Sequence, residues 1–196
     1  MSTDRLDQQM AFLLEADRLK SVLRGTPIAD GSRPENSAEH SWHIMLYALT
    51  LAEHANRPIA IDRVLRMLML HDLVEIDAGD APIHGDHDKE ALAAAEAKAA
   101  DRIFGLLPPD QRDSYRALWD EFEAAETDDA IFAKSLDRVQ PVVCNLASGG
   151  GSWPAYNVTP DQLETRVGAK VRCGAPALWS HLAPRIAAWF KSQSHS

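Results

Sequence analysis

A His-Asp pair with a glutamate one turn further on is the feature of this sequence most suited to chemistry. His71 and Asp72 are adjacent in an apolar stretch that begins at Leu68, and Glu75 follows them. Burying unpaired charge is costly, and a bound cation is one of the few ways to keep both groups in an apolar segment at neutral pH. The pair therefore predicts a metal site, provided that the chain supplies further ligands.

His40 and Asp137 can supply them. Each lies in a separate stretch with helical apolar spacing, and helices of a bundle can bring such side chains to one point. Two imidazoles and two carboxylates suit a first-row ion such as Mn, Co, Fe, Ni or Zn better than Mg or Ca. We therefore predict one divalent transition metal held by His40, His71, Asp72 and Asp137, with positions left open for water and a substrate oxygen.

Four motifs extend this pattern: Arg-Pro-Glu-Asn-Ser-Ala-Glu-His at 33–40, His-Asp-Leu-Val-Glu-Ile-Asp-Ala-Gly-Asp at 71–80, Leu-Trp-Asp-Glu-Phe-Glu at 118–123 and Lys-Ser-Leu-Asp-Arg at 134–138. Together they resemble the HD-domain phosphohydrolase superfamily, in particular its 5′-deoxynucleotidase branch, over about residues 10–150. The resemblance implies a metal-dependent phosphatase that removes the 5′-phosphate from deoxyribonucleoside monophosphates.

The resemblance also assigns roles to individual residues. It gives the four metal ligands named above and places Glu75 at the catalytic acid/base position. Asp80 matches an acid that positions the attacking water or the substrate, and Arg24 matches an arginine that contacts the substrate. Gly25 stands where a member of the family has Trp, so no stacking residue is carried over to that position.

Elementary chemistry agrees with these roles. A divalent ion acidifies bound water and polarises a phosphoryl oxygen, and Glu75, on the same helix face as the pair, could transfer a proton. Arg24 and Arg33 are candidates for bidentate contacts to phosphate, and Lys134, one turn before Asp137, could add positive charge. The sequence offers no residue for reading a base edge, so we expect a loose base preference.

Other interpretations remain open. A second metal could bind through His43, His84 and His87. The substrate could be another phosphoester, such as a nucleoside triphosphate, a cyclic nucleotide or an alarmone. The chain could also be a metal-binding or interaction protein without turnover.

The elements that must position these residues are helices. Apolar spacing, caps and breakers predict helices over about 4–24, 37–53, 62–76, 88–104 and 107–123, then from the caps Thr127 and Thr159, and over 177–191, with Pro141 expected to kink or end its helix. Residues 26–36 are predicted to be a loop, and no stretch has a convincing strand pattern. We predict an all-α fold: a single HD domain over 1–196, a helical bundle with the metal site in its interior and residues 151–196 as a helical extension packing on it.

Composition limits the class of partner. The chain has 196 residues, 45% of them hydrophobic, and a net charge of −9, which disfavours a nucleic-acid polymer but allows a small nucleotide. There is no membrane-length apolar run, no signal-peptide pattern at residues 1–9, and no ligand-type spacing of the two cysteines. We expect a cytoplasmic protein that forms a homodimer.

Overall fold

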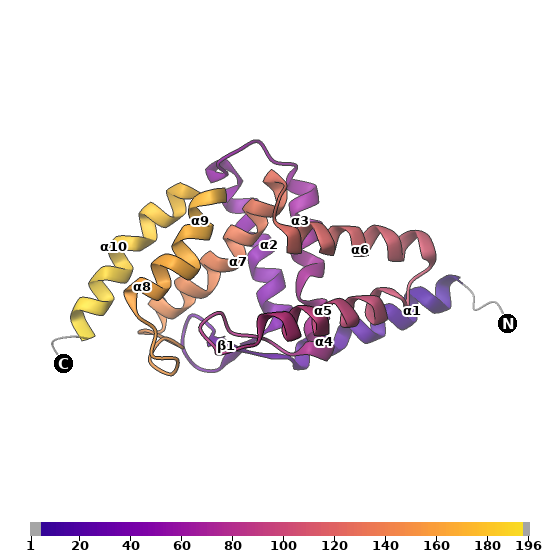
Figure 1. The fold of residues 1–196 in the computed structure, drawn as a ribbon, viewed down its shortest axis with the longest axis horizontal. Helices are drawn as coiled ribbons and strands as arrows, with labels where there is room; N and C mark the ends of the chain where they lie inside the picture. The colour runs from indigo at the N-terminus through magenta and orange to yellow at the C-terminus, as the bar shows by residue number, and fades with distance from the viewer. Residues whose placement is uncertain (1–4, 194–196) are drawn as a thin grey trace.

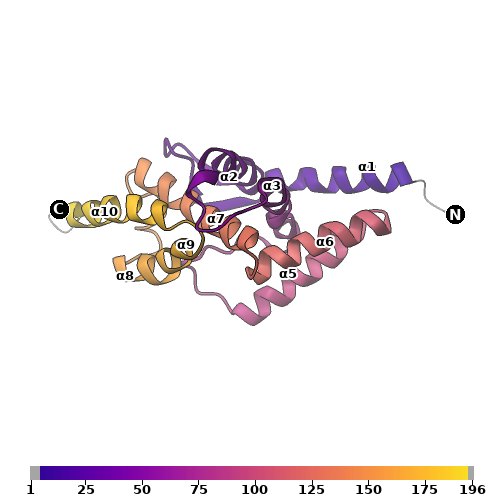
Figure 2. The ribbon, with the colours of Figure 1, turned by 90° about the horizontal axis from the view of Figure 1, so that it is seen from above.

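The computed structural model describes residues 5–193. The fold is all-α, as predicted, apart from one small hairpin. It is elongated, with α1 and α10 at opposite ends of its long axis (Figures 1 and 2). None of the helices over residues 5–193 is long and apolar enough to cross a membrane.

Three helices form the centre of the bundle: α2 (Ser37–Leu51), α3 (Ile61–Leu70) and α7 (Asp128–Ala147). They pack on one another through fully buried side chains such as Ile44, Met67 and Leu136. Thr127 caps α7 as predicted, its side chain accepting a hydrogen bond from the amide of Ala130. Pro141, expected to kink or end this helix, lies inside it, and the helix continues to Ala147.

The N-terminal segment differs from its prediction. The helix α1 (Arg5–Ala16) and a 3₁₀ helix, η1 (Asp17–Ser21), lead into an antiparallel hairpin of β1 (Leu23–Pro27) and β2 (Pro34–Asn36). The predicted helix over 4–24 therefore ends too late, and the prediction that no stretch forms a strand is also wrong. The predicted start of that helix at Asp4 lies outside the described residues. Residues 1–4, part of the stretch searched for a signal peptide, lie outside them as well. The apolar spacing of Leu19, Val22 and Leu23 fits a helix locally, but long-range ion pairs hold Arg24 in the interior.

The His-Asp pair itself lies in a break between helices. The segment η3 (His71–Val74) is a fully buried 3₁₀ turn, followed by the short helix α4 (Glu75–Ala78). Gly79, at φ 77°, ends α4 in a conformation that favours glycine. The continuous helix predicted over 62–76 is thus three segments, and α3 begins after Ala60 rather than at an Asp62 cap.

Two long helices cover this break. They are α5 (Lys89–Phe104), capped by the side chain of Asp88, and α6 (Pro109–Ala124). Both contact η3, and α6 also packs on α7. They shield the His-Asp pair from solvent on that side.

The C-terminal elements pack against the other part of α7. Thr159 and Gln162 form a capping box at α8 (Pro160–Leu163), and a π-helical turn, η4 (Glu164–Gly168), α9 (Ala169–Gly174) and α10 (Pro176–Gln193) follow. With Trp153 from the turns before α8, they form a second apolar cluster that includes Leu163 and Trp179. α7 gives Phe132 and Leu136 to the first cluster and Val139 and Val142 to the second, so Asp137 stands where the two meet.

Candidate metal centre

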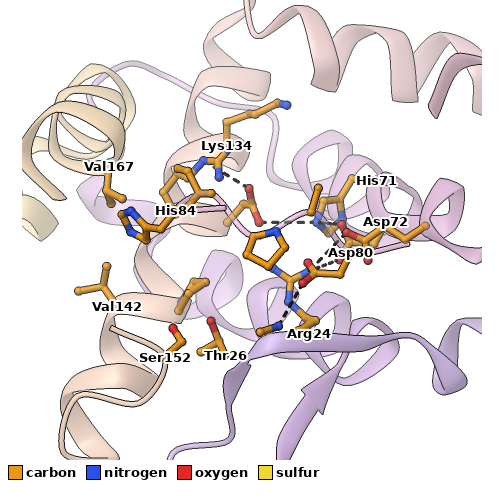
Figure 3. A pocket seen from close by; sticks show the side chains of 18 of the residues that line it. Arg24, Thr26, His71, Asp72, Asp80, His84, Lys134, Val142, Ser152 and Val167 are labelled. Carbon is orange, nitrogen blue, oxygen red and sulfur yellow. Dashed lines mark hydrogen bonds and ion pairs between the residues drawn. The ribbon is translucent and has the colours of Figure 1, made fainter. Parts of the chain in front are cut away.

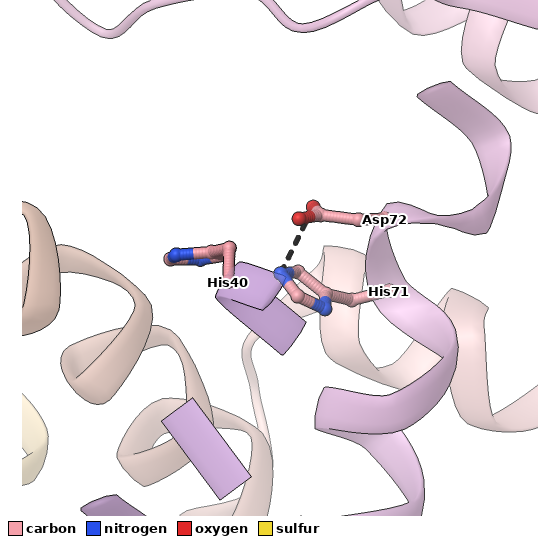
Figure 4. Close-up of side chains that lie close together, drawn as sticks. All are labelled: His40, His71 and Asp72. Atoms are coloured by element: carbon pink, nitrogen blue, oxygen red, sulfur yellow. Dashed lines mark ion pairs between the residues drawn. The ribbon is translucent and has the colours of Figure 1, made fainter. Parts of the chain in front are cut away.

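The structure brings the four predicted ligands together from three elements. His40 comes from α2, His71 and Asp72 from η3, and Asp137 from α7. His40, His71 and Asp72 each offer a ligand atom within 4.8 Å of the others (Figure 4). Asp137 Oδ1 lies 3.1 Å from His40 Nε2 and 3.8 Å from His71 Nε2. Both imidazoles therefore turn the same nitrogen toward one carboxylate.

The state of His71 fits a bound cation. Its Nδ1 lies 2.8 Å from the carbonyl oxygen of Leu68, to which it can donate. Its Nε2, 2.9 Å from Asp72 Oδ1, is buried and makes no hydrogen bond within the described residues. A neutral imidazole with this tautomer aims a lone pair at two carboxylates, and only a cation satisfies all three groups. The donor set therefore suits a transition ion of the predicted kind.

Without a metal, a proton takes that place. Burial lowers the pKa of His71, but the carboxylates of Asp72 and Asp137 outweigh it and raise the pKa to about 10. Burial and the charge of Arg24 lower the pKa of His40. The hydrogen bonds of His40 to Asp137 and Glu35 outweigh them and raise this pKa above its usual value. A metal ion would have to displace these protons.

A buried network outside the centre orients His40. Its Nδ1 lies 3.0 Å from Gln140 Oε1 and 3.3 Å from Glu35 Oε2, while Gln140 Nε2 donates to Glu35 Oε1 at 2.7 Å. Partners of this kind fix the tautomer and direction of a ligating imidazole. Sequence reasoning missed both residues. The available signals were a glutamate within the 33–40 motif and a glutamine one turn after Asp137 in an apolar helix.

Arg24 lies among the acidic groups. Its Nη1 is 3.0 Å from Asp72 Oδ2, 3.7 Å from Glu75 Oε1 and 3.6 Å from Asp80 Oδ1. Burial alone would lower the pKa of Arg24, but these carboxylates raise it above its usual value. The guanidinium is thus a fixed positive charge beside the metal ligands.

Glu75 and Asp80 lie on the same side as Arg24. Ser37 Oγ donates to Glu75 Oε2 at 2.5 Å, and the amide of Gly25 donates to Asp80 Oδ2 at 3.1 Å. Burial, followed by the charge of Asp72, raises the pKa of Glu75 to about 9. Burial also raises the pKa of Asp80. Both carboxyl groups are therefore placed to hold a proton near the centre.

The two remaining candidates for substrate binding, Lys134 and Arg33, lie in different places. Lys134 lines the cavity beside the centre, where its Nζ donates to Glu123 at 2.9 Å and lies 4.5 Å from the ring centroid of Phe122. Arg33 lies outside that lining, because its exposed guanidinium makes two hydrogen bonds to Glu39, a residue of the capping box of α2.

The histidines of the dinuclear alternative form no ligand cluster within residues 5–193. His43 stacks on Trp42 and contacts Gln140, His84 lines the cavity, and His87 is exposed. Over residues 5–193, the trio of His40, His71 and Asp72 is the one cluster of three or more such ligands.

A cavity of about 440 Å³ opens from the centre toward the C-terminal elements (Figure 3). One end, here called the metal end, is lined by Arg24, His71, Asp72, Glu75, Asp80 and Asp137. The opposite end, here called the far end, is lined by His84, Val142 and Val167 (Figure 3), and Asn145 and Tyr156 also line the cavity. Glu96 also lines the cavity; burial raises its pKa, and sequence reasoning did not single it out.

Comparison with known proteins identifies the class. Residues 16–179 match the HD domain family, so the chain belongs to the HD-domain family, as the motifs predicted. Its relatives include the 5′-deoxynucleotidase HDDC2 of Mus musculus, 29% identical over 68% of this chain and 66% of the relative. A 5′-deoxynucleotidase of Enterobacter sp. (strain 638) is 29% identical over 67% of this chain and 69% of the relative.

A solved structure extends the likeness. A crystal structure described as a predicted metal-dependent phosphohydrolase from Magnetospirillum magnetotacticum MS-1 has a TM-score of 0.89 and 45% identity, and the match covers 96% of this chain and 97% of that one. By contrast, the match spans slightly under two thirds of the length of the mouse and human HDDC2 proteins.

Proposed function

We propose that this HD-domain protein is a metal-dependent phosphohydrolase that removes the 5′-phosphate from deoxyribonucleoside monophosphates. The observation that carries the proposal is the convergence of His40, His71, Asp72 and Asp137 beside a cavity that is also lined by the buried Arg24. The names of the relatives, 5′-deoxynucleotidases and a predicted metal-dependent phosphohydrolase, support the same reaction class.

The metal end has a group for each requirement of hydrolysis. A divalent ion, when bound, supplies a Lewis acid for the phosphoryl oxygen and acidifies water. Arg24 offers positive charge to the other phosphate oxygens, and Lys134, which also lines the cavity, adds a second cation.

Proton transfer falls to the chain's own acids. Water adds its oxygen to phosphorus and the bond from phosphorus to the 5′-oxygen breaks, so one proton leaves the water and one reaches the 5′-oxygen. Glu75, held by Ser37, is placed to donate or accept these protons. Asp80, held by the amide of Gly25, can orient the attacking water.

The test is phosphate release by metal-stripped protein resupplied with Mn, Co, Fe, Ni or Zn. The substrates are deoxy- and ribonucleoside 5′-monophosphates, nucleoside triphosphates, cyclic nucleotides and alarmones. We expect activity that depends on the added metal and is highest with the deoxyribonucleoside monophosphates. Metal-independent release, or preference for another phosphoester, would contradict the proposal.

A variant pair separates catalysis from metal binding alone. Glu75→Gln should retain the metal and lose phosphate release, whereas Glu126→Gln, at an exposed position between α6 and α7 outside the cavity lining, should retain both. A wild type that binds metal but hydrolyses nothing would favour a non-catalytic protein.

A further inference from the structure

The cavity is larger than its metal chemistry requires. A phosphate and its metal occupy only the metal end, whereas the whole cavity of about 440 Å³ lies within the size range of pockets that enclose complete small molecules. Figure 3 shows His84, Val142 and Val167 at the end away from His71 and Asp72. A substrate whose phosphate lies at the metal end therefore has space for the rest of the molecule at the far end.

The walls of the far end are apolar and firmly packed. Val142 from α7 and Val167 from η4 are 3% and 2% exposed and belong to the second apolar cluster. Their backing by that cluster gives the far end a fixed shape before any ligand enters. Such walls suit the faces of a flat apolar group.

Two polar groups interrupt these walls. His84 Nδ1 is buried and has no hydrogen-bond partner within the described residues. Asn145 uses its Oδ1 to accept from the amide and the hydroxyl of Ser152, which fixes the amide plane and leaves the NH₂ group as a donor. Burial, then Arg166 and Arg138, lower the pKa of His84 to about 4, so its imidazole is neutral and can both donate and accept.

Tyr156 forms the remaining wall, and Gly25 makes room for it. A Cβ at Gly25 would lie 2.9 Å from Tyr156 Oη and 3.1 Å from Pro82 Cγ. The same Gly25 donates its amide proton to Asp80 at the metal end. The aromatic ring of Tyr156 thus stands between the two ends, supplied by the 148–159 segment that no motif of the sequence singled out.

We propose that the far end binds the nucleobase of the substrate, with Tyr156 against the ring and His84 and Asn145 at its polar edge. This inference rests on the proposed function and adds to it the residues that recognise the base. A nucleobase has apolar faces and a hydrogen-bonding edge, which matches apolar walls carrying two isolated polar groups. It also replaces the expected loose base preference with a measurable one.

The experiment compares nucleotides with 2-deoxyribose 5-phosphate, which keeps the sugar and phosphate but lacks the base. We expect the wild type to favour nucleotides in kcat/KM, and Tyr156→Ala to lower the ratio of the two kcat/KM values about tenfold, the loss typical of one base–aromatic contact. His84→Ala should narrow the spread of kcat/KM among the four bases. Pro154→Ala, an exposed neighbour in the same segment outside the cavity lining, is the matched control.

Equal losses with both substrates in Tyr156→Ala would overturn the inference, because they would reveal a purely structural role. A wild type that does not distinguish nucleotides from 2-deoxyribose 5-phosphate would also overturn it, while leaving the proposed phosphatase intact. If the wild type releases no phosphate at all, the proposed function fails instead. In that case the binding of deoxynucleosides, measured by the change in tryptophan fluorescence, tests the inference. The wild type should bind deoxynucleosides more tightly than Tyr156→Ala, and equal or absent binding would contradict a base site at the far end.

Discussion

The metal end of the cavity is built from buried charges, whereas the far end is built from apolar side chains with single polar groups. At the metal end Arg24 pairs with Asp72, and both Asp72 and Asp137 face the imidazole of His71. At the far end Val142 and Val167 are held by the second apolar cluster. Charged groups that depend on mutual neutralisation are sensitive to any lost partner, while apolar walls tolerate moderate changes of shape. The predicted effects of substitution are therefore largest at the metal ligands and smaller where apolar contacts shape the cavity.

The largest effect is expected from losing a metal ligand. Asp137→Asn keeps the size of the side chain but removes the charge that faces both imidazoles. Phosphate release should fall more than about 100-fold, because loss of a residue that only supports a metal ligand costs at most about that much. Bound metal, measured by elemental analysis, should fall below one equivalent per chain. Asp128→Asn, exposed at the start of the same helix, is the control. Full activity in Asp137→Asn would remove Asp137 from the centre.

Breaking the network behind His40 should have the next largest effect. Gln140→Leu removes the bond to His40 Nδ1 and the bond to Glu35. We expect metal affinity to fall about 10- to 100-fold, because His40 is no longer held in direction, as measured by competition with a chromogenic chelator. Gln111→Leu breaks a hydrogen bond to Gln9 away from the cavity and should leave the affinity unchanged. Equal affinities for the two variants would show that the network does not support the centre.

Metal affinity should rise with pH. In the metal-free protein the pKa of His71 is raised to about 10, so its imidazole carries a proton at neutral pH. A metal binds only the deprotonated ring, so the affinity should increase up to about tenfold per pH unit for each proton released, as pH rises from about 6 toward that pKa. Calorimetric titrations in buffers of different ionisation enthalpy would count the released protons. An affinity that stays flat over this range contradicts the proposed neutral ligand.

The smallest effect is expected where the two ends meet. Gly25 does not have a left-handed backbone, so Gly25→Ala changes only the contact with Tyr156 and Pro82. Since the Tyr156 hydroxyl is the end of a movable side chain, stability should fall by only about 1 kcal/mol, measured by urea denaturation. Selectivity for nucleotides over 2-deoxyribose 5-phosphate should fall less than in Tyr156→Ala. A loss of metal binding in Gly25→Ala would show that the two ends are not separable.

Local signals in the sequence determined the helical fold and the candidate metal ligands. Thr127 and Thr159 start helices because their side chains cap the free amides of the first turn. The His71–Asp72 pair predicted a cation because an apolar segment cannot hold both groups alone. The helix starts could be predicted from residues close in sequence. The ligand set could be predicted because imidazoles and carboxylates share one requirement, a cation to bind.

Tertiary structure decided the rest. The hairpin over 23–36 and the 3₁₀ turn at His71 depend on contacts with distant helices, which outweigh a weak local preference for helix. The pairing of Arg33 with Glu39, the support of His40 by Gln140 and the approach of Tyr156 to Gly25 are likewise side-chain contacts. Apolar spacing says which face of a helix is buried but not which residue it will meet, because that choice is made only when the whole chain has packed.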